Sequence, residues 1–418
     1  MNKVEICSPA GSYESLAAAL KAGADSVYFG IGHLNMRARS SVNFTLADLN
    51  KIRRISEKNG VKNYLVLNSV LYDNELPLMK KICAAAKSAG IHAVVAGDMA
   101  AINYASSIGL SVHISVQANV CNSEAVRLFS RYADVMVLAR ELPLAGIKKI
   151  TNFIRKNKIT GPSGNLVRIE IFAHGALCVS ISGKCYMSLA VYNSSANRGE
   201  CYQNCRRKYL VSDAETGEQL VIDNKYVMSP KDICTLPFLD SIIDADVSIL
   251  KIEGRGRSPD YVYAVTRAYR EAVESCRDGS FSPAKSQMWM KELSSVFNRG
   301  FWGGYYLGEK LDAWCGTGGN LSPKRKIHIG KVLNYYQKSG VADFALEAGG
   351  LKKGDEIMVC GTTTGVASQI VDSLMFNGEF VETAPKGSTV SVSFQEKLRK
   401  GDKLYLVTPR KFGESPED

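Results

Sequence analysis

The stretch "VEICSPAGSYESLAAALKAGADSVYFGIG", residues 4–32, places a short apolar run, a helical pattern and a second apolar run in close succession. The helical pattern begins after Ser12, a residue type that caps helices, and a glycine follows its end. Strands that read as nearly continuous apolar runs and alternate with helices are typical of a parallel sheet covered on both faces. The stretch therefore predicts one strand–helix–strand repeat of such a sheet.

The same pattern recurs along the first two thirds of the chain. Further apolar runs lie at 63–70, 92–98, 111–119, 135–141, 167–175 and 247–255, with helical patterns between most of them. Eight units of this kind predict an α/β fold, a (β/α)8 TIM-like barrel over residues 1–282. A doubly wound open sheet is the alternative, but "CSPAGSYES" lacks the GxGxxG fingerprint of its dinucleotide-binding form.

The pattern of predicted secondary structure changes after the barrel. Residues 283–323 read as a helix and a linker, and residues 324–418 as short alternating strands with turn signals. "LKKGDEIMV" (351–359) and "LRKGDKLYLV" (398–407) form a weak internal repeat in which Gly-Asp turns the chain into a strand. These features predict a small C-terminal β-barrel domain, which either binds RNA or braces the larger domain.

Composition limits the partners and the location. The 418 residues are 45% hydrophobic and 22% charged, an ordinary globular composition. The N-terminal residues lack the positively charged segment and apolar stretch of a signal peptide, and no apolar run is long enough to span a bilayer. We therefore expect a cytoplasmic protein without a membrane partner. The net charge of +11 favours a polyanion such as RNA over a basic surface that binds nothing.

Cysteines are concentrated in a predicted insertion after the seventh strand, residues 176–235. It contains Cys178, Cys185, Cys201, Cys205 and Cys234, out of eleven cysteines in the chain. Structural zinc sites usually take cysteines in closely spaced pairs, whereas thiolates from separate loops suit an iron–sulfur cluster. Five candidates for four ligand positions leave one spare, and separate buried thiols are the alternative.

Polar residues at the ends of the apolar runs mark a candidate site, because the active sites of such barrels lie at the C-terminal ends of the strands. The candidates are Asn35, Arg37, Arg39, Asn68, Gln117, Glu141, His174, Lys251, Glu253 and Arg255.

Several motifs resemble one known family in the same order. "IEIFAHGALCVSISGKCYMS" is similar to the signature of the collagenase-like peptidases, a family that also contains bacterial tRNA hydroxylation proteins, a ribosomal RNA hydroxylation protein and the anaerobic ubiquinone hydroxylation pair. "SPAGSYESLAAALKAGADSVYFG", "RGECYQNCRRKY", "SPKDIC", "KIEGR" and "NRGF" resemble its other motifs. The resemblance covers most of the chain.

The resemblance implies a barrel with a [4Fe-4S] cluster held by Cys178, Cys185, Cys201 and Cys234, with Cys205 as an extra member. It also implies hydroxylation that depends on prephenate instead of molecular oxygen. The main expectation is that the product is 5-hydroxyuridine at the tRNA wobble position. The alternative substrate is ribosomal RNA or a quinone precursor. In that case the protein would act as one subunit of a pair with a homologous partner.

Roles follow for the candidate residues. Arginine binds carboxylates bidentately, so Arg37, Arg39 and Arg255 suit prephenate, with Asn35 and Lys251 beside them. Asn68, Gln117 and Tyr202 suit the stacking and hydrogen bonding of a flipped base. The groups best placed for proton transfer are Glu141, His174 and Glu253, and the RNA-binding candidates are Arg206, Arg207, Lys208, Lys324, Arg325 and Lys326. For each candidate at the strand ends, a purely structural role is the alternative to a functional one.

Proteolysis and a non-catalytic scaffold are the competing functions. Neither GxSxG nor HExxH occurs in the chain. A thiol protease built from Cys178 and His174 is conceivable, but nothing in the spacing makes these side chains meet. In the scaffold alternative, the barrel binds RNA and a partner performs the chemistry.

Overall fold

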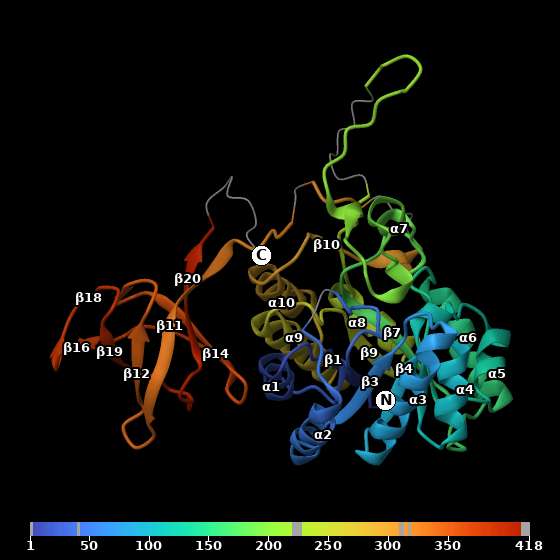
Figure 1. Ribbon diagram of the computed structural model, residues 1–418, viewed down its shortest axis with the longest axis horizontal. Coiled ribbons are helices and arrows are strands. Elements are labelled where there is room, and N and C mark those ends of the chain that lie inside the picture. Colours follow the sequence, from blue (N-terminus) through green and yellow to red (C-terminus); the bar gives the residue numbers. More distant parts are fainter. Residues whose placement is uncertain (1–2, 40–41, 220–227, 309–312, 317–318, 411–418) are drawn as a thin grey trace.

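A computed structural model describes residues 3–39, 42–219, 228–308, 313–316 and 319–410. Its first unit is a closed barrel of eight parallel strands, with β9 paired to both β7 and β1 (Figure 1). The strands are β1 (Glu5–Pro9), β2 (Ser26–Gly30), β3 (Lys62–Leu67), β4 (Ala93–Ala96), β5 (Val112–Ile114), β6 (Val135–Val137), β7 (Arg168–Gly175) and β9 (Ile249–Ile252). Seven lie within the predicted runs and β3 begins one residue before its run, which confirms the TIM-like barrel.

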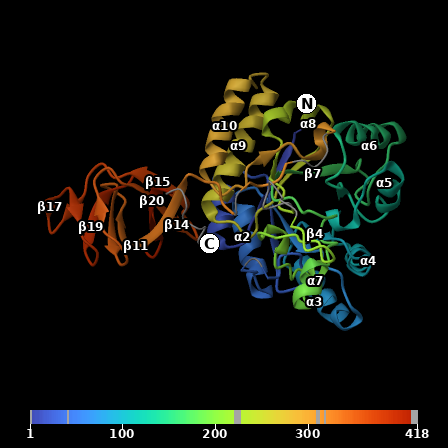
Figure 2. The ribbon, with the colours of Figure 1, turned by 90° about the horizontal axis from the view of Figure 1, so that it is seen from above.

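Helices surround the barrel, as the view in Figure 2 shows. The first, α1 (Tyr13–Lys21), is capped by Ser12, whose side chain accepts a hydrogen bond from the backbone N–H of Ser15, and it buries Leu16 and Ala19. The others in the described barrel are α2 (Leu49–Lys58), α3 (Leu76–Ser88), α4 (Met99–Ser107), α5 (Ser123–Phe129), α6 (Leu144–Asn157), α8 (Leu239–Asp244) and α9 (Pro259–Arg277). None of the described helices is both long and apolar enough to cross a membrane.

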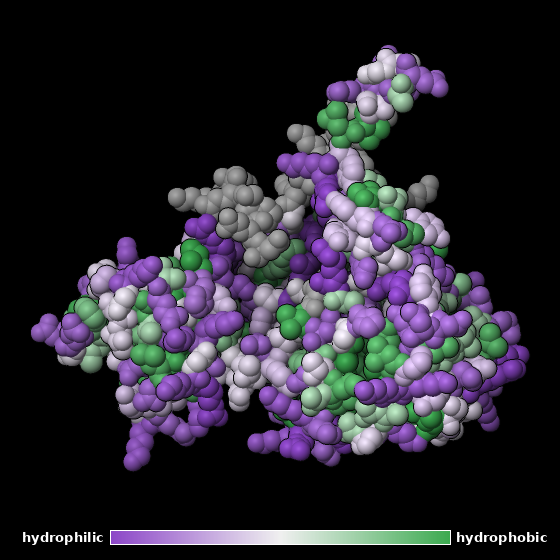
Figure 3. All heavy atoms as spheres, viewed as in Figure 1, coloured by the Kyte–Doolittle hydropathy of each residue, from purple (hydrophilic) through white to green (hydrophobic). Residues whose placement is uncertain are grey.

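The insertion between β7 and α8 forms a cap over the C-terminal ends of the strands. It contains α7 (Met187–Tyr192) and β8 (Asp232–Cys234), which pairs antiparallel with the end of β7. Arg198 of this cap donates two hydrogen bonds to Glu75, at 2.9 and 2.8 Å, so the cap is fastened to the loop before α3. An arm near residue 210 projects from the cap and exposes Leu210 (Figures 1 and 3).

The second unit lies beside the barrel on the side of α9 (Figure 2). It follows α10 (Pro283–Ser295) and β10 (Phe301–Trp302). Its antiparallel sheet has the order β15-β14-β20-β11-β12-β19-β16-β17, which confirms the predicted all-β unit. The bounds are β11 (Lys324–Tyr336), β12 (Val341–Leu346), β14 (Glu356–Gly361), β15 (Gly365–Ile370), β16 (Met375–Phe376), β17 (Glu379–Phe380), β19 (Thr389–Ser393) and β20 (Lys403–Pro409), with a separate pair β13 (Leu351–Lys352) and β18 (Thr383–Ala384).

The internal repeat has a structural meaning in this unit. Its two copies contribute β14 and β20, which are antiparallel neighbours with Ile357 opposite Leu406. An ion pair between Lys326 on β11 and Asp260 on α9 joins the unit to the barrel. The first strand of this unit, β11, begins at Lys324.

Candidate functional site

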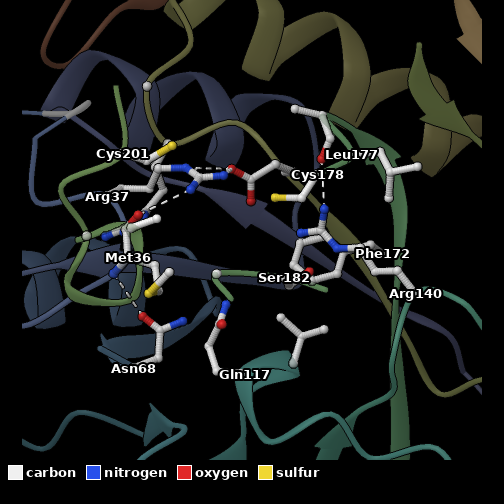
Figure 4. Close-up of a pocket in the computed structure, with 18 of the residues that line it drawn as sticks. Met36, Arg37, Asn68, Gln117, Arg140, Phe172, Leu177, Cys178, Ser182 and Cys201 are labelled. Carbon is white, nitrogen blue, oxygen red and sulfur yellow. Dashed lines mark hydrogen bonds and ion pairs between the residues drawn. The ribbon is translucent and has the colours of Figure 1, made fainter. Parts of the chain in front are cut away.

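A cavity of about 200 Å³ lies between the C-terminal ends of the barrel strands and the cap (Figure 4). Its described lining includes one carboxylate, Glu253, and seven cationic side chains. We call it the arginine cavity after these cations, which are Arg37, Arg140, Arg206, Lys251, Arg255, Arg257 and Arg299. The predicted residues Asn68 and Gln117 also line it. A site with this charge balance favours an anionic ligand.

Arg37 and Glu253 form the central ion pair of the cavity. Arg37 donates to Oε1 of Glu253 from Nε at 3.0 Å and from Nη2 at 2.6 Å. Burial alone would raise the pKa of Glu253, but Arg37, Arg140 and Arg255 outweigh it and lower that pKa below its ordinary value. Glu253 is therefore ionised at neutral pH and acts as an anchor for Arg37.

Asn35 supports the same network from below the cavity surface. It is fully buried, and its Oδ1 accepts hydrogen bonds from the Arg37 backbone N–H at 3.1 Å and from Arg255 Nη2 at 2.7 Å. Gly30 provides the space for Arg255, because a Cβ at position 30 would lie 2.1 Å from Nη1 of this guanidinium. Asn35 therefore positions two arginines, a role closer to support than to the predicted substrate contact.

Two guanidinium groups that line this cavity have buried donors without a partner in the described chain. Arg140 lies over the Phe172 ring and donates Nη1 to the carbonyl of Ala176 at 2.8 Å, but its Nε has no hydrogen-bond partner among the described residues. Nη1 of Arg255 is likewise buried without a partner in the described chain. Burial lowers the pKa of Arg255 to about 10, so it is still charged at neutral pH. Buried donors that lack a partner are costly unless a ligand supplies one.

Lys251 lies lower, within the barrel. Its Nζ donates to Oε1 of Glu170 at 2.6 Å and lies 4.5 Å from the centre of the Tyr28 ring. Burial would lower the pKa of Lys251, but Glu170 outweighs it and raises that pKa. This ion pair forms part of the floor beneath the cavity.

Four cysteines of the cap line the arginine cavity: Cys178, Cys185, Cys201 and Cys205. Figure 4 shows Cys178 and Cys201 near Arg37, across the cavity from Asn68 and Gln117. Burial raises the pKa of the Cys205 thiol to about 11, and the other three cysteines contribute to the rise. Among the described residues, no three His, Cys, Asp or Glu side chains are close enough to hold a single metal ion. Four thiols distributed around one cavity are a donor set that fits a larger iron–sulfur cluster.

The structure places Cys234 away from these four thiols. Its Sγ lies 3.5 Å from Sδ of Met290 on α10 and 3.9 Å from the Tyr269 hydroxyl on α9, and burial raises the pKa of the thiol to about 12. Strand β8 directs Cys234 to the outer face of the sheet, which those helices cover. The thiol group that the structure brings together therefore contains Cys205 in place of Cys234.

His174 also lies outside the cavity. A register shift between Phe172 and His174, in the pairing of β7 with β9, breaks the alternation that would point residue 174 into the barrel. The imidazole is instead surrounded by the rings of Tyr261, Tyr269 and Phe301, 5.6 to 6.0 Å away. Burial lowers its pKa to about 4, although Asp232 opposes the shift. His174 is therefore a neutral core residue without access to a ligand in the cavity.

The remaining predicted rim residues differ in position. Glu141 is exposed beside Tyr305 and Tyr306 and does not line the cavity. The guanidinium of Arg39 lies 3.7 Å from the centre of the Tyr202 ring, which stacks on Tyr192. Arg39 therefore extends an aromatic stack on the outside of the cap.

The predicted RNA-binding residues fall into three places. Arg206 is inside the cap, where it donates to Ser229 and to the carbonyls of Pro230 and Leu177, so it holds the insertion together. Arg207 and Lys208 are exposed at the base of the arm. In the second unit, Lys324 is paired with Glu356, Arg325 donates to Thr408, and Lys326 is paired with Asp260.

Sequence reasoning assigned no role to three cations of the cavity. They are Arg140, Arg257 and Arg299. Arg140 ends the sixth apolar run, Arg257 lies two positions after Arg255, and Arg299 lies in "NRGF", so strand ends and the family motif were available signals.

The thiol-protease alternative paired Cys178 with His174, but Cys178 lines the arginine cavity and His174 lies outside it among aromatic rings. The cysteine beside His174 is Cys234. His174 and Cys234 are direct neighbours in the register of β7 and β8. Both are buried, and their pKa values of about 4 and about 12 keep both groups neutral near pH 7. A thiolate nucleophile needs an accessible, electropositive setting, which this pair lacks.

Comparison with known proteins gives the family. Residues 11–315 match Peptidase family U32. The chain is 50% identical over 410 residues to a protein named collagenase from Porphyromonas gingivalis W83, which covers 98% of this chain and 99% of that protein. It is 39% identical over 412 residues to uncharacterized protease MJ0090 of Methanocaldococcus jannaschii, covering 97% of this chain and 99% of the relative.

A more distant relative carries a different kind of name. The chain is 27% identical over 367 residues to tRNA hydroxylation protein P1 of Bacillus subtilis, with 86% of this chain and 84% of that protein covered. The family match covers well over half of the chain, and it agrees with the resemblance found in the motifs. The chain therefore belongs to peptidase family U32.

Proposed function

We propose that the protein is an iron–sulfur RNA-modification enzyme that hydroxylates the tRNA wobble uridine to 5-hydroxyuridine with prephenate and without molecular oxygen. The observation that carries the proposal is the composition of the arginine cavity. Arg140 and Arg255, each with one buried donor that has no partner in the described chain, line a cavity with seven cations, one carboxylate and four thiols. A dicarboxylate such as prephenate would supply the missing acceptors.

The thiols support the cofactor part of the proposal. Cys178, Cys185 and Cys201 would hold a [4Fe-4S] cluster, with Cys205 as the fourth ligand. Such a cluster supplies electron transfer beside the bound substrate. The chain itself would bind and orient the anion through Arg37, Arg140 and Arg255, while the cap excludes water.

The relatives support RNA as the substrate, because one of them is named for tRNA hydroxylation. The net charge of +11 is compatible with a polyanionic partner. Others are named collagenase or protease, so proteolysis is the second function to test.

The test expresses the chain anaerobically in a bacterial strain from which the genes for its own tRNA and ribosomal RNA 5-hydroxylation have been removed. Mass spectrometry of tRNA nucleosides should then show 5-hydroxyuridine with the wild-type chain and not with an Arg255→Met chain. The proposal is wrong if the folded, cluster-containing protein produces no such nucleoside. Formation of 5-hydroxycytidine in ribosomal RNA instead would replace the substrate, and cleavage of denatured collagen by purified protein would replace the reaction.

A further inference from the structure

A second cavity of about 220 Å³ lies beside the arginine cavity and shares Asn68 and Gln117 with it. The loops after β3, β4 and β5 form three of its sides, and the cap forms the fourth. We call it the amide cavity; its other described lining residues with side chains are Ser69, Val70, Asp98, Lys184, Tyr186 and Asn197.

The charge of the amide cavity differs from that of its neighbour. Its carboxylate, Asp98, is the N-cap of α4 and accepts a hydrogen bond from the backbone N–H of Ala100 at 2.9 Å. It also accepts a hydrogen bond from the backbone N–H of Leu71 at 3.1 Å. The described lining adds one cation, Lys184, which is exposed. With no excess of positive charge, the amide cavity suits a neutral polar ligand, while the arginine cavity suits an anion.

Hydrogen-bonding groups in the amide cavity are available for such a ligand. Ser69 is 2% exposed, and its Oγ has no hydrogen-bond partner in the described chain. The structure also gives the Gln117 side-chain amide no hydrogen bond to any described residue. Gly97 and Gly183 make room for this side chain, since a Cβ at either position would lie 2.8 or 2.4 Å from Gln117. The lining of the amide cavity therefore contributes one hydroxyl and one amide that lack a hydrogen-bond partner in the described chain.

Asn68 is fixed as the wall between the cavities. Its Oδ1 accepts a hydrogen bond from the backbone N–H of Met36 at 3.1 Å (Figure 4). Its Nδ2 donates to Ser115 Oγ at 3.1 Å. A ligand in the amide cavity would thus place one edge beside this wall, next to whatever occupies the arginine cavity.

The size and the mouth of the amide cavity restrict the ligand further. Pockets for drug-sized ligands usually measure about 300–1,000 Å³, so this one fits a single ring system better than a peptide segment. Tyr186 is 75% exposed and contributes an aromatic ring to the lining. Bases displaced from a strand commonly stack on such rings and are read by amide and hydroxyl groups at their edges.

We infer that the amide cavity binds the pyrimidine base that is to be modified, with Gln117 and Ser69 at its polar edge and Tyr186 against its face. This inference rests on the proposed function and assigns a separate subsite to the base. The base and the anion would then meet across Asn68.

The test uses the full chain and a short single-stranded oligoribonucleotide with 5-iodouridine at one position. Photocrosslinking followed by peptide mass spectrometry should place the crosslink in residues 184–186. Tyr186→Ala should weaken binding about tenfold, because stacking on one base typically contributes that much. Ser69→Ala should weaken it by a smaller factor without changing the cavity volume. Phe380→Ala is the matched control, because Phe380 is 76% exposed in the second unit.

The outcomes separate the two proposals. If hydroxylated nucleoside forms but the crosslink lies elsewhere and Tyr186→Ala binds like the wild type, the base subsite is wrong and the enzyme assignment stands. If the oligoribonucleotide does not bind and no nucleoside is modified, the proposed function fails as well. Displacement of the oligoribonucleotide by a collagen-type peptide would assign the amide cavity to a peptide and overturn the inference.

Discussion

Arg37 donates two hydrogen bonds to a single carboxylate oxygen, Oε1 of Glu253, and so closes one ion pair inside the arginine cavity. We expect Glu253→Gln to lower the free energy of unfolding by about 1–3 kcal/mol, because it leaves a largely enclosed guanidinium without its counter-charge. Urea unfolding at neutral pH measures the change. The control is Glu347→Gln, which removes an exposed partner of Lys331 and should cost less than about 1 kcal/mol. Equal losses for both variants would contradict a special role for the Arg37 pair.

Arg255 should behave in the opposite way. Its Nη1 is buried without a partner among the described residues, and burial lowers the pKa of Arg255 although Glu253 opposes this shift, so Arg255→Met removes a charge that the ligand-free fold compensates only in part. We expect the variant to be as stable as the wild type or more stable, by up to about 2 kcal/mol, and to lose prephenate binding. Thermal unfolding and calorimetric titration with prephenate check the two parts. A destabilised variant that still binds prephenate would make Arg255 a structural residue.

The four thiols of the cavity predict which cysteines hold iron. Cys205→Ala should lose acid-labile sulfide, iron and visible absorbance after anaerobic purification, whereas Cys234→Ala should retain them. Cys83→Ala, a change at another buried thiol, is the control for general destabilisation. If Cys234→Ala loses the cluster and Cys205→Ala keeps it, the ligand set implied by the family resemblance is correct, and cluster binding must rearrange β8.

The barrel was predictable because its signal is local. Each parallel strand is buried on both faces, so its apolar run is visible without knowledge of its neighbours. Strand ends also identified Arg37, Asn68, Gln117, Lys251, Glu253 and Arg255, because parallel strands carry their C-terminal residues to the same rim.

The positions of the other predicted site residues depend on how the strands pair and on the path of the cap. Spacing in the sequence does not encode either of these. His174 would face the barrel interior if the side chains of β7 alternated regularly between the two faces of the sheet. The register shift after Phe172 instead points the His174 side chain toward the surrounding helices. Cys234 is the last residue of β8, and the antiparallel pairing of β8 with β7 is likewise set by the tertiary structure. Cys205 and Cys201 were equivalent by spacing, and only the path of the cap brings both to the cavity.

Acid sensitivity should come from the opposite end of the barrel. Glu5 accepts hydrogen bonds from Tyr64 at 2.6 Å, Lys62 at 3.1 Å and Arg168 at 3.0 Å. Burial would raise the pKa of Glu5, but these three partners outweigh it and lower the pKa from 4.5 to about 2. A carboxyl with a lower pKa in the folded state stabilises fully above its unfolded pKa, and the contribution disappears as pH falls through the folded value.

Glu5→Gln should therefore lower the free energy of unfolding by about 2–3 kcal/mol at pH 7, and by progressively less as the pH is lowered from 4.5 towards 2. Urea unfolding of both proteins at pH 7 and pH 3 checks the trend. Glu57→Gln, which affects an exposed pair with Arg53, should show almost no difference at either pH. A cost of Glu5→Gln that is independent of pH would mean that packing, and not charge, is what the glutamate contributes.

The basic residues near the cap make a prediction about RNA affinity. Arg207 and Lys208 are exposed at the base of the arm, where Arg207 also contacts Tyr192, and Lys326 pairs with Asp260 between the two units. Each lost phosphate contact lowers the slope of log affinity against log salt concentration by about one. The double change of Arg207 and Lys208 to Gln should therefore reduce the slope for tRNA by up to about two. The control is the same change at Lys148 and Lys149, an exposed pair on α6, and it should leave the slope unchanged. Lys326→Gln should loosen the contact between the units and lower stability without the same effect on the slope. If the α6 pair changes the slope and the cap pair does not, tRNA approaches the side of the barrel, and the base could not reach the amide cavity from there.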